Sequence, residues 1–303
     1  MTATAPRDTE TPARRGNALT GLIRTMRPRQ WVKNVLVLAA PFASGDVFDV
    51  GVLTAVAVAF VAFSFAASGV YLINDVKDVE ADRAHPTKCN RPIAAGVVPA
   101  QLATAVAGLL FAASIGISLL ASIDLAVVAV VYIVVQLSYC LWLKHQPVMD
   151  IAIVASGFLL RAIAGGAAGQ IDLSQWFLLA AGFGSLFMVA GKRYAEIRLA
   201  ERTGAKIRKS LEGYTPTYLR FVWTLSASVL IMTYGLWAFQ LSEANHSRWP
   251  VISMVPFVLA VLRYAVDVDG GNGGEPEEIA LGDRLLQVLG GFLVLTLIAA
   301  VYL

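Results

Sequence analysis

The chain has 303 residues, of which 57% are hydrophobic and only 15% are charged, and its formal net charge is +3. An ordinary soluble domain carries about 25% charged residues, so this composition excludes a soluble globular enzyme and a disordered protein. Because the apolar runs are continuous and rich in Leu, Ala and Val, a transmembrane β-barrel is disfavoured as well. The composition predicts an all-α, polytopic membrane protein.

Nine apolar runs, most of them long enough to cross a bilayer as a helix, follow one another along the chain. They cover residues 31–45, 52–73, 101–121, 124–143, 149–169, 175–191, 217–240, 250–266 and 284–303. The first run is the shortest, and Pro41 interrupts it. We expect nine transmembrane helices in a single domain over residues 23–303, preceded by a disordered cytoplasmic tail over residues 1–22.

The basic residues mark one side of this arrangement. Of the 24 Lys and Arg residues, 22 fall in the N-terminal region or in alternate loops, and only Arg161 and Arg248 do not. Since short cytoplasmic loops are enriched in Lys and Arg, the N-terminus is predicted to be cytoplasmic. The long loops, at about 74–100, 192–216 and 267–283, lie on that same side. We therefore expect a plasma-membrane protein whose active-site face is cytoplasmic.

The end of the second run carries the first cluster of polar residues. Asn74, Asp78 and Asp82 are spaced four residues apart, which places them on one face if the helix continues out of the membrane. Tyr71 lies about one turn earlier on that face. Oxygen-bearing side chains in this pattern suit Mg²⁺, which binds through a few carboxylates together with substrate phosphates. The alternative is a solvated helix of mixed charge that follows the membrane span.

Basic residues after this cluster favour a phosphate-bearing ligand, because Lys88 and Arg91 lie next to the candidate metal site. The cluster and the segment after it resemble the first signature of the UbiA superfamily of intramembrane prenyltransferases: Asn74, Asp75, Asp78 and Asp82, then Arg91, Pro92 and Gly96. The resemblance covers nearly the whole chain and implies a UbiA-type bundle. It also implies that Asn74, Asp78 and Asp82 hold Mg²⁺, with Asp75, Asp78 and Asp82 taking part in catalysis at a bound diphosphate.

The sixth run ends in a cluster that departs from the pattern of that superfamily, whose members carry a second aspartate motif at this place. The corresponding residues here are Gly191, Lys192, Arg193, Tyr194, Ala195, Glu196 and Arg198. The two expected acids fall at Gly191 and Arg198, and only Glu196 is acidic. A cationic cluster disfavours a second Mg²⁺ and favours additional anionic oxygen. The alternative is that these basic residues only mark the cytoplasmic boundary.

This departure is similar to one branch of the superfamily, in which the prenyl group belongs to the acceptor. That branch transfers 5-phosphoribose from 5-phosphoribosyl 1-diphosphate to decaprenyl or a related polyprenyl phosphate and releases pyrophosphate. Its product leads to the arabinose donor for cell-wall arabinogalactan and lipoarabinomannan. Donor and acceptor together bring a diphosphate, a 5-phosphate and an acceptor phosphate, which agrees with Lys192 and Arg193 in place of acids. The resemblance implies a Mg²⁺-dependent pentosyltransferase.

The roles of the other candidate residues follow from charge and position. The substrate-binding candidates are Lys33, Tyr71, Lys88, Arg91, Arg161, Lys192, Arg193, Tyr194 and Glu196. Lys33 has a second interpretation as an anchor at the membrane boundary. Arg161 lies in the middle of a run, where a charge is costly, so we expect it to face either a polar cavity or a structural partner.

Two other functions stay open at the level of sequence. A conventional prenyltransferase would move a prenyl chain from its diphosphate to an aromatic ring, and the missing second aspartate motif argues against it. A transporter would place polar residues at the membrane midplane on broken helices, whereas the clusters here lie at helix ends. We expect membrane lipid and no nucleic acid as a partner, and a homo-oligomer is left open.

Overall fold

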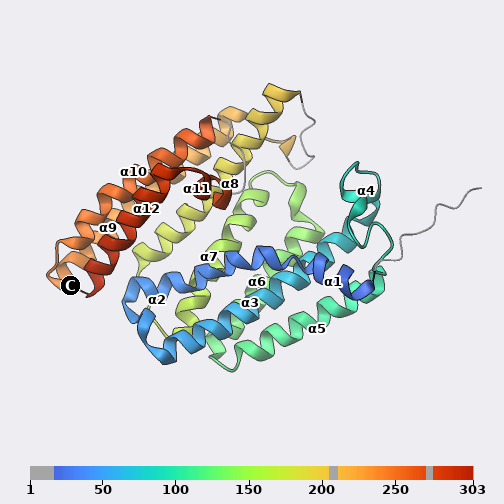
Figure 1. The fold of residues 1–303 in the computed structure, drawn as a ribbon, viewed down its shortest axis with the longest axis horizontal. Coiled ribbons are helices and arrows are strands. Elements are labelled where there is room, and N and C mark those ends of the chain that lie inside the picture. Colours follow the sequence, from blue (N-terminus) through green and yellow to red (C-terminus); the bar gives the residue numbers. More distant parts are fainter. Residues whose placement is uncertain (1–16, 205–210, 271–275, 303) are drawn as a thin grey trace, which may run out of the picture.

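The computed structural model describes residues 17–204, 211–270 and 276–302, and within these ranges the chain is helical without any β-strand (Figure 1). This confirms the all-α prediction. The elements in chain order are α1 (Ala18–Met26), the 3₁₀ helix η1 (Pro28–Leu38), α2 (Ala39–Ser44), η2 (Asp46–Phe48), α3 (Val50–Lys77), α4 (Val79–Arg83), η3 (Lys88–Asn90), α5 (Ala100–Ser118), α6 (Ile123–Leu141), η4 (Leu143–His145), α7 (Met149–Gly169), α8 (Gln175–Thr203), α9 (Pro216–Asn245), α10 (Trp249–Asp269), α11 (Pro276–Gly282) and α12 (Arg284–Tyr302).

Polar side chains fix where several long helices begin. Asp49, Ser122, Ser174 and Thr215 each accept a hydrogen bond from the backbone N–H three residues further on, at 2.9–3.1 Å. These residues satisfy backbone donors that have no partner inside the helix. The helices α3, α6, α8 and α9 therefore start within about two residues of the predicted apolar runs.

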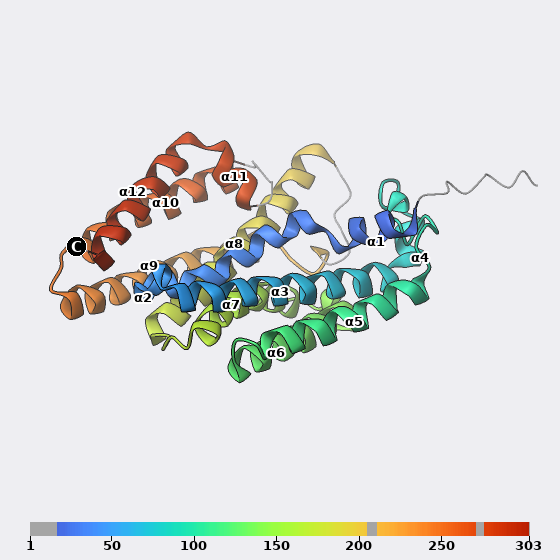
Figure 2. The same cartoon turned by 60° about the horizontal axis from the view of Figure 1, so that its bottom comes forward.

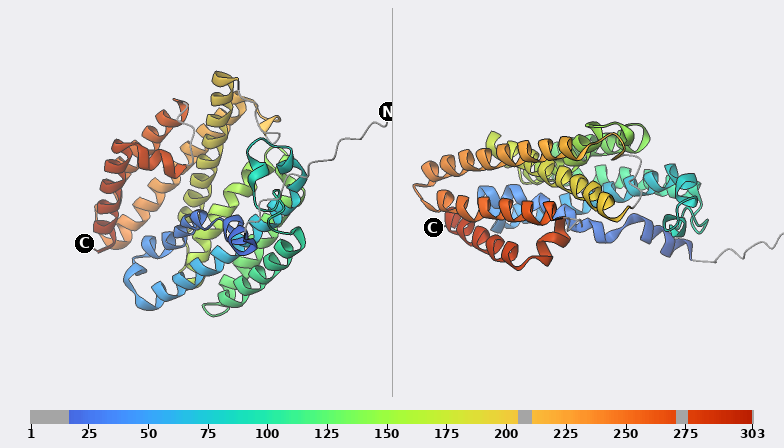
Figure 3. Two further views of the ribbon diagram at one scale, coloured as in Figure 1. Left: turned by 45° about the vertical axis from the view of Figure 1, so that its right-hand side comes forward. Right: turned by 90° about the horizontal axis from the view of Figure 1, so that it is seen from above.

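The helices pack in sequence around the molecule. In the first half, α3 packs against α5, α6 and α7; α7 packs against α8, and α8 against α9. In the second half, α10 packs against α9 and α12. Figure 2 shows α10 and α12 on one side of the molecule and α5 and α6 on the other. Figure 3 shows the long helices running roughly side by side, with α1 and the segment around α4 at the same end of the bundle.

In the part of the chain that the structure describes, six helices are long and apolar enough to cross a membrane, namely α3, α5, α6, α7, α9 and α10. Residues 284–300, within α12, form a shorter apolar helix. The helix α8 is also long, but its C-terminal part carries Lys, Arg and Glu side chains. The count of nine membrane crossings and the cytoplasmic N-terminus stay predictions.

The first predicted run, 31–45, is not one regular α-helix. It divides into η1 and α2, and η1 is held against two other helices. Trp31 Nε1 donates to Ser68 Oγ at 3.1 Å, and Asn34 Nδ2 donates to Ser64 Oγ at 3.0 Å, both on α3. On its other side, the backbone of Val37 packs directly on α7.

Residues 18–22 belong to α1, whereas the sequence assigned them to the tail. Asn17 caps this helix by accepting from the Leu19 N–H at 3.0 Å. Gly21 allows α1 to lie close to the segment after η3, because a Cβ there would approach Val98 to 2.7 Å. The rest of the predicted tail, residues 1–16, lies outside the described residues, as do residues 205–210 and 271–275 of two predicted loops.

Candidate functional site

A polar cavity of about 330 Å³ lies beside the C-terminal end of α3. It is lined by Arg24, Thr25, Arg27, Asp75, Thr87, Lys88, Asn90, Arg91 and Pro92. The basic residues come from α1, from the joint between α1 and η1, and from the segment around η3. Basic residues from these three parts of the chain thus surround one aspartate, and the cavity is suited to a multiply charged anion.

Asp75 is the electrostatic centre of this cavity. Its side chain is buried, and its Oδ1 lies 2.7 Å from Arg27 Nη2 and 3.3 Å from Arg91 Nη1. The same Arg91 nitrogen lies 2.8 Å from Asp82 Oδ2, so this guanidinium bridges two buried carboxylates. The Arg27 guanidinium also lies over the ring of Tyr71, 4.8 Å from its centroid. Asp75 therefore positions two of the basic residues that border the cavity.

Asp78 lies at a break between α3 and α4 and faces a different cation. Its φ and ψ are −93° and 6°, so the helix does not continue regularly through this residue as the sequence predicted. Backbone hydrogen bonds still join Asp78 N to Asn74 O at 3.0 Å and Asp82 N to Asp78 O at 2.8 Å. The Asp78 carboxylate forms an ion pair with Lys144, from the loop after α6.

The predicted metal ligands are thus on successive turns, but Asp78 and Asp82 carry separate counter-charges. Within the described ranges, no group of three or more His, Cys, Asp or Glu side chains is arranged to hold a metal. The donor set of Asn74, Asp78 and Asp82 nevertheless consists only of oxygens that suit a hard cation. By ligand type these residues fit Mg²⁺, which would replace Lys144 and Arg91 as the neutralising charge.

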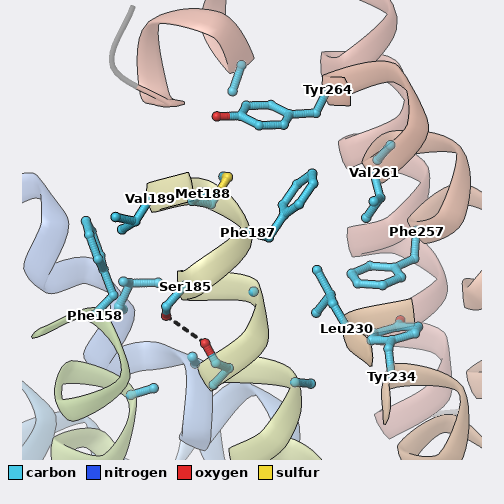
Figure 4. A pocket seen from close by; sticks show the side chains of 18 of the residues that line it. Phe158, Ser185, Phe187, Met188, Val189, Leu230, Tyr234, Phe257, Val261 and Tyr264 are labelled. Carbon is cyan, nitrogen blue, oxygen red and sulfur yellow. Dashed lines mark hydrogen bonds between the residues drawn. The ribbon is translucent and has the colours of Figure 1, made fainter. Parts of the chain in front are cut away.

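A second, larger cavity of about 1030 Å³ is mainly apolar. Figure 4 shows its wall, where Phe158 and Val189 lie on one side and Leu230, Tyr234 and Phe257 on the other. The cavity is bordered by η1, α2 and helices α7 to α12. The cationic side chains in its lining are Lys33, Lys192 and Arg193. An apolar cavity that carries cations fits an amphiphile with an anionic head group.

Arg193 is buried beside this cavity and is held by Asp150 of α7. Its Nε lies 3.1 Å from Asp150 Oδ2, and its Nη2 lies 3.1 Å from Asp150 Oδ1. Glu196 lies further away, with its Oε2 3.8 Å from Arg193 Nη1. Lys33, in η1, has its Nζ 5.9 Å from the centroid of the Phe158 ring. The structure thus brings Lys33, Lys192 and Arg193 to one cavity, with Glu196 next to Arg193.

Tyr194 and Arg161 are not among the lining residues of either cavity, and both make structural contacts. Tyr194 is fully buried, and its hydroxyl bonds to Asp269 Oδ1 at 2.7 Å and to the Arg220 guanidinium. Arg161 donates to Asn34 Oδ1 at 2.7 Å, to the Gly157 carbonyl at 2.6 Å and to the Tyr132 hydroxyl at 3.0 Å. For Arg161, these contacts are those of the structural partner that the sequence left as one alternative.

Arg27 lines the polar cavity, Lys144 pairs with Asp78, and Asp150 binds Arg193, although the sequence analysis assigned none of the three a role. Lys144 is a single basic residue in a short loop, and Asp150 is an acid in the first turn of an apolar run. The position of Asp150 at the start of an apolar run could have marked it as a site residue, because a carboxylate there needs a buried partner. Nothing local in the sequence pairs Lys144 with Asp78, 66 residues away.

Comparison with known proteins places this geometry in a family. Residues 35–281 match the UbiA prenyltransferase family. The chain is 61% identical to a decaprenyl-phosphate phosphoribosyltransferase of Mycolicibacterium smegmatis, over 94% of each protein. It is 60% identical to a decaprenyl-phosphate phosphoribosyltransferase of Mycobacterium tuberculosis, over 97% of each. The fold resembles that of a UbiA homolog from Archaeoglobus fulgidus bound to GPP and Mg²⁺, with a TM-score of 0.69 and 16% identity, covering 93% of this chain and all of the other.

Proposed function

The chain belongs to the UbiA prenyltransferase family, and we propose that it transfers 5-phosphoribose from 5-phosphoribosyl 1-diphosphate to decaprenyl phosphate. About 60% identity to decaprenyl-phosphate phosphoribosyltransferases, over nearly the full chain, supports this activity. The observation that carries the proposal is the pair of cavities, one polar and cationic, the other apolar with cations in its lining. They match a water-soluble phosphorylated donor and a lipid phosphate acceptor.

The element η1 joins the two cavities. Arg27, directly before η1, borders the polar cavity, and Lys33, six residues further on, borders the apolar one. We assign the donor to the polar cavity, where Lys88 and Arg91 contact its phosphates. We assign the polyprenyl chain to the apolar cavity, where Lys33, Lys192 and Arg193 face the acceptor phosphate.

The reaction breaks the bond between ribose C1 and the diphosphate and forms a bond from C1 to an oxygen of the acceptor phosphate. A phosphate monoester is largely dianionic near neutral pH because its second pKa is about 6, so the nucleophile needs no strong general base. A bound Mg²⁺ supplies neutralisation of charge at the leaving diphosphate, and Asn74, Asp78 and Asp82 are the residues that would hold it. The basic side chains bind and orient both substrates, so positioning and electrostatics supply most of the catalysis.

The membrane arrangement belongs to the same proposal. We propose nine crossings, a cytoplasmic N-terminus and an active-site face on the cytoplasmic side of the plasma membrane. The distribution of basic residues supports this orientation, since both cationic clusters then face the side on which the soluble donor is made. The product would supply a pathway to the arabinose donor of cell-wall polysaccharides.

The test uses purified full-length protein in detergent with decaprenyl phosphate, radiolabelled 5-phosphoribosyl 1-diphosphate and Mg²⁺. We expect label to enter the organic phase, and we expect Asp78→Ala and Lys192→Ala to abolish or strongly reduce this transfer. The matched controls are Asp172→Ala and Arg248→Ala, which alter exposed residues outside both cavity linings. Consumption of a prenyl diphosphate with an aromatic acceptor, without transfer of phosphoribose, would contradict the proposal.

A further inference from the structure

Asp150 is a fully buried carboxylate in the first turn of α7, outside both cavity linings. Besides the two bonds from Arg193, its Oδ1 accepts a hydrogen bond from the Tyr139 hydroxyl of α6 at 2.9 Å. The carboxylate therefore joins α6, α7 and α8 at one point. A buried charge of this kind is costly unless its partners are in place, which fixes the geometry of each partner.

The segment that leads into Asp150 is itself held firmly. Val148 has φ 71° and ψ −52°, a conformation that a β-branched residue rarely adopts. Its N–H donates to the Tyr214 hydroxyl at 2.7 Å, and Pro147 packs so closely on Gly213 that a Cβ there would approach Pro147 Cγ to 2.5 Å. Contacts with the segment before α9 thus maintain a strained backbone immediately before Asp150.

Arg193 is the arginine among the cationic residues that line the apolar cavity. The buried Asp150 carboxylate, on another helix, accepts hydrogen bonds from two of its guanidinium nitrogens. A guanidinium has five N–H groups, and Asp150 accepts a hydrogen bond from the Nε–H and one from an Nη2–H. The remaining donors include Nη1, which lies 3.8 Å from Glu196 Oε2 and would divide its charge between Glu196 and a bound anion. The planar fork also fixes the direction in which those donors point.

We propose that Asp150 is a positioning residue for the acceptor, holding Arg193 so that its remaining N–H groups face the phosphate of the polyprenyl phosphate. This inference rests on the proposed function, because it deepens the assignment of the apolar cavity to the acceptor. The ion pair is separate from the carboxylates of the polar cavity. Loss of Asp150 therefore affects the acceptor and leaves the binding of the donor unchanged.

The test compares Asp150→Asn with Asp124→Asn, which changes another aspartate in the first turn of a helix but leaves both cavities untouched. Replacing a charged hydrogen-bond acceptor by a neutral one raises the KM for decaprenyl phosphate about tenfold, since ionic hydrogen bonds are roughly twice as strong as neutral ones. The KM for 5-phosphoribosyl 1-diphosphate stays within about twofold of the wild-type value, because no charged hydrogen bond at the donor cavity is changed. Direct binding of decaprenyl phosphate in detergent weakens by the same factor, and this readout needs no turnover.

A double variant separates positioning from a general loss of structure. If Asp150 acts through Arg193, then Asp150→Asn adds almost nothing to the effect of Arg193→Gln on acceptor binding. Additive effects, or equal changes in the KM of donor and acceptor, would overturn the inference. If Asp150→Asn does not fold, Asp150→Glu and Tyr139→Phe provide the same comparison, with smaller changes in the same direction. Failure of the wild-type protein to transfer phosphoribose, with lipid phosphate still bound through Arg193, would contradict only the proposed function.

Discussion

The contact between η1 and α7 gives the clearest prediction about the fold. Gly165 of α7 lies against the backbone of Val37, and a Cβ at this position would lie 1.8 Å from the Val37 carbonyl oxygen. Non-bonded carbon–oxygen contacts in proteins are about 3.3–3.6 Å, so in Gly165→Ala the two backbones must separate by about 1.5 Å or more. Overpacking of this kind costs about 1–3 kcal/mol, and backbone on both sides makes the upper end appropriate.

The assay is thermal unfolding of the purified protein in detergent, with Gly182→Ala as the matched control. A Cβ at Gly182 of α8 would lie 3.7 Å from Leu159, which is ordinary contact, and Ala favours a helix over Gly by up to about 1 kcal/mol. We expect Gly165→Ala to lower the melting temperature and Gly182→Ala to leave it unchanged or raise it. Because η1 carries Lys33, Gly165→Ala should also raise the KM for the acceptor. Equal stability of the two variants would refute the reasoning.

Three more predictions concern charge and metal. The backbone N–H of Leu286 and the guanidinium of Arg263 lower the pKa of Asp283 to about 2. The ionised Asp283 therefore stabilises the fold above the usual pKa of an aspartate, about 3.9, and this stabilisation is lost as the pH falls towards 2. Asp283→Asn should remove this part of the acid dependence of the melting temperature, and an unaltered pH profile would contradict the prediction. Arg91→Gln removes charged hydrogen bonds worth roughly 1.5–3 kcal/mol each, so the donor KM should rise at least about tenfold while that of the acceptor does not change. Chelation by EDTA should stop transfer, and added Mg²⁺ should restore it; full activity in EDTA would exclude the metal.

The boundaries of the long helices could be predicted from the sequence, because they depend on local signals. The apolar runs 149–169 and 284–303 correspond to α7 and α12 within one residue. The ends of such runs coincide with capping residues and with the first charged side chains, all of which are adjacent in the chain. The clusters at 74–82 and 192–196 were also visible, since their residues lie within a turn or two of one another.

The pairing of those clusters with distant residues could not be predicted in the same way. Arg27 and Asp75 are 48 residues apart, and Arg193 and Asp150 are 43 apart. Nothing in a local pattern says which cation meets which carboxylate, because the packing of whole helices decides it. The sequence also placed Asn74, Asp78 and Asp82 on one continuous helical face, whereas the turn at Asp78 directs that carboxylate to Lys144.

The 3₁₀ geometry of η1 has a consequence for the reach of the shortest apolar run. A 3₁₀ helix rises about 2.0 Å per residue and an α-helix about 1.5 Å. The 11 residues of η1 and the 6 residues of α2 therefore extend about 31 Å if they are collinear, whereas the same 17 residues in α-helical form extend only about 26 Å. The hydrocarbon core of a bilayer is about 30 Å thick. If η1 and α2 are collinear, the 3₁₀ geometry thus brings this segment to about the thickness of that core, while its crossing of the membrane stays a prediction.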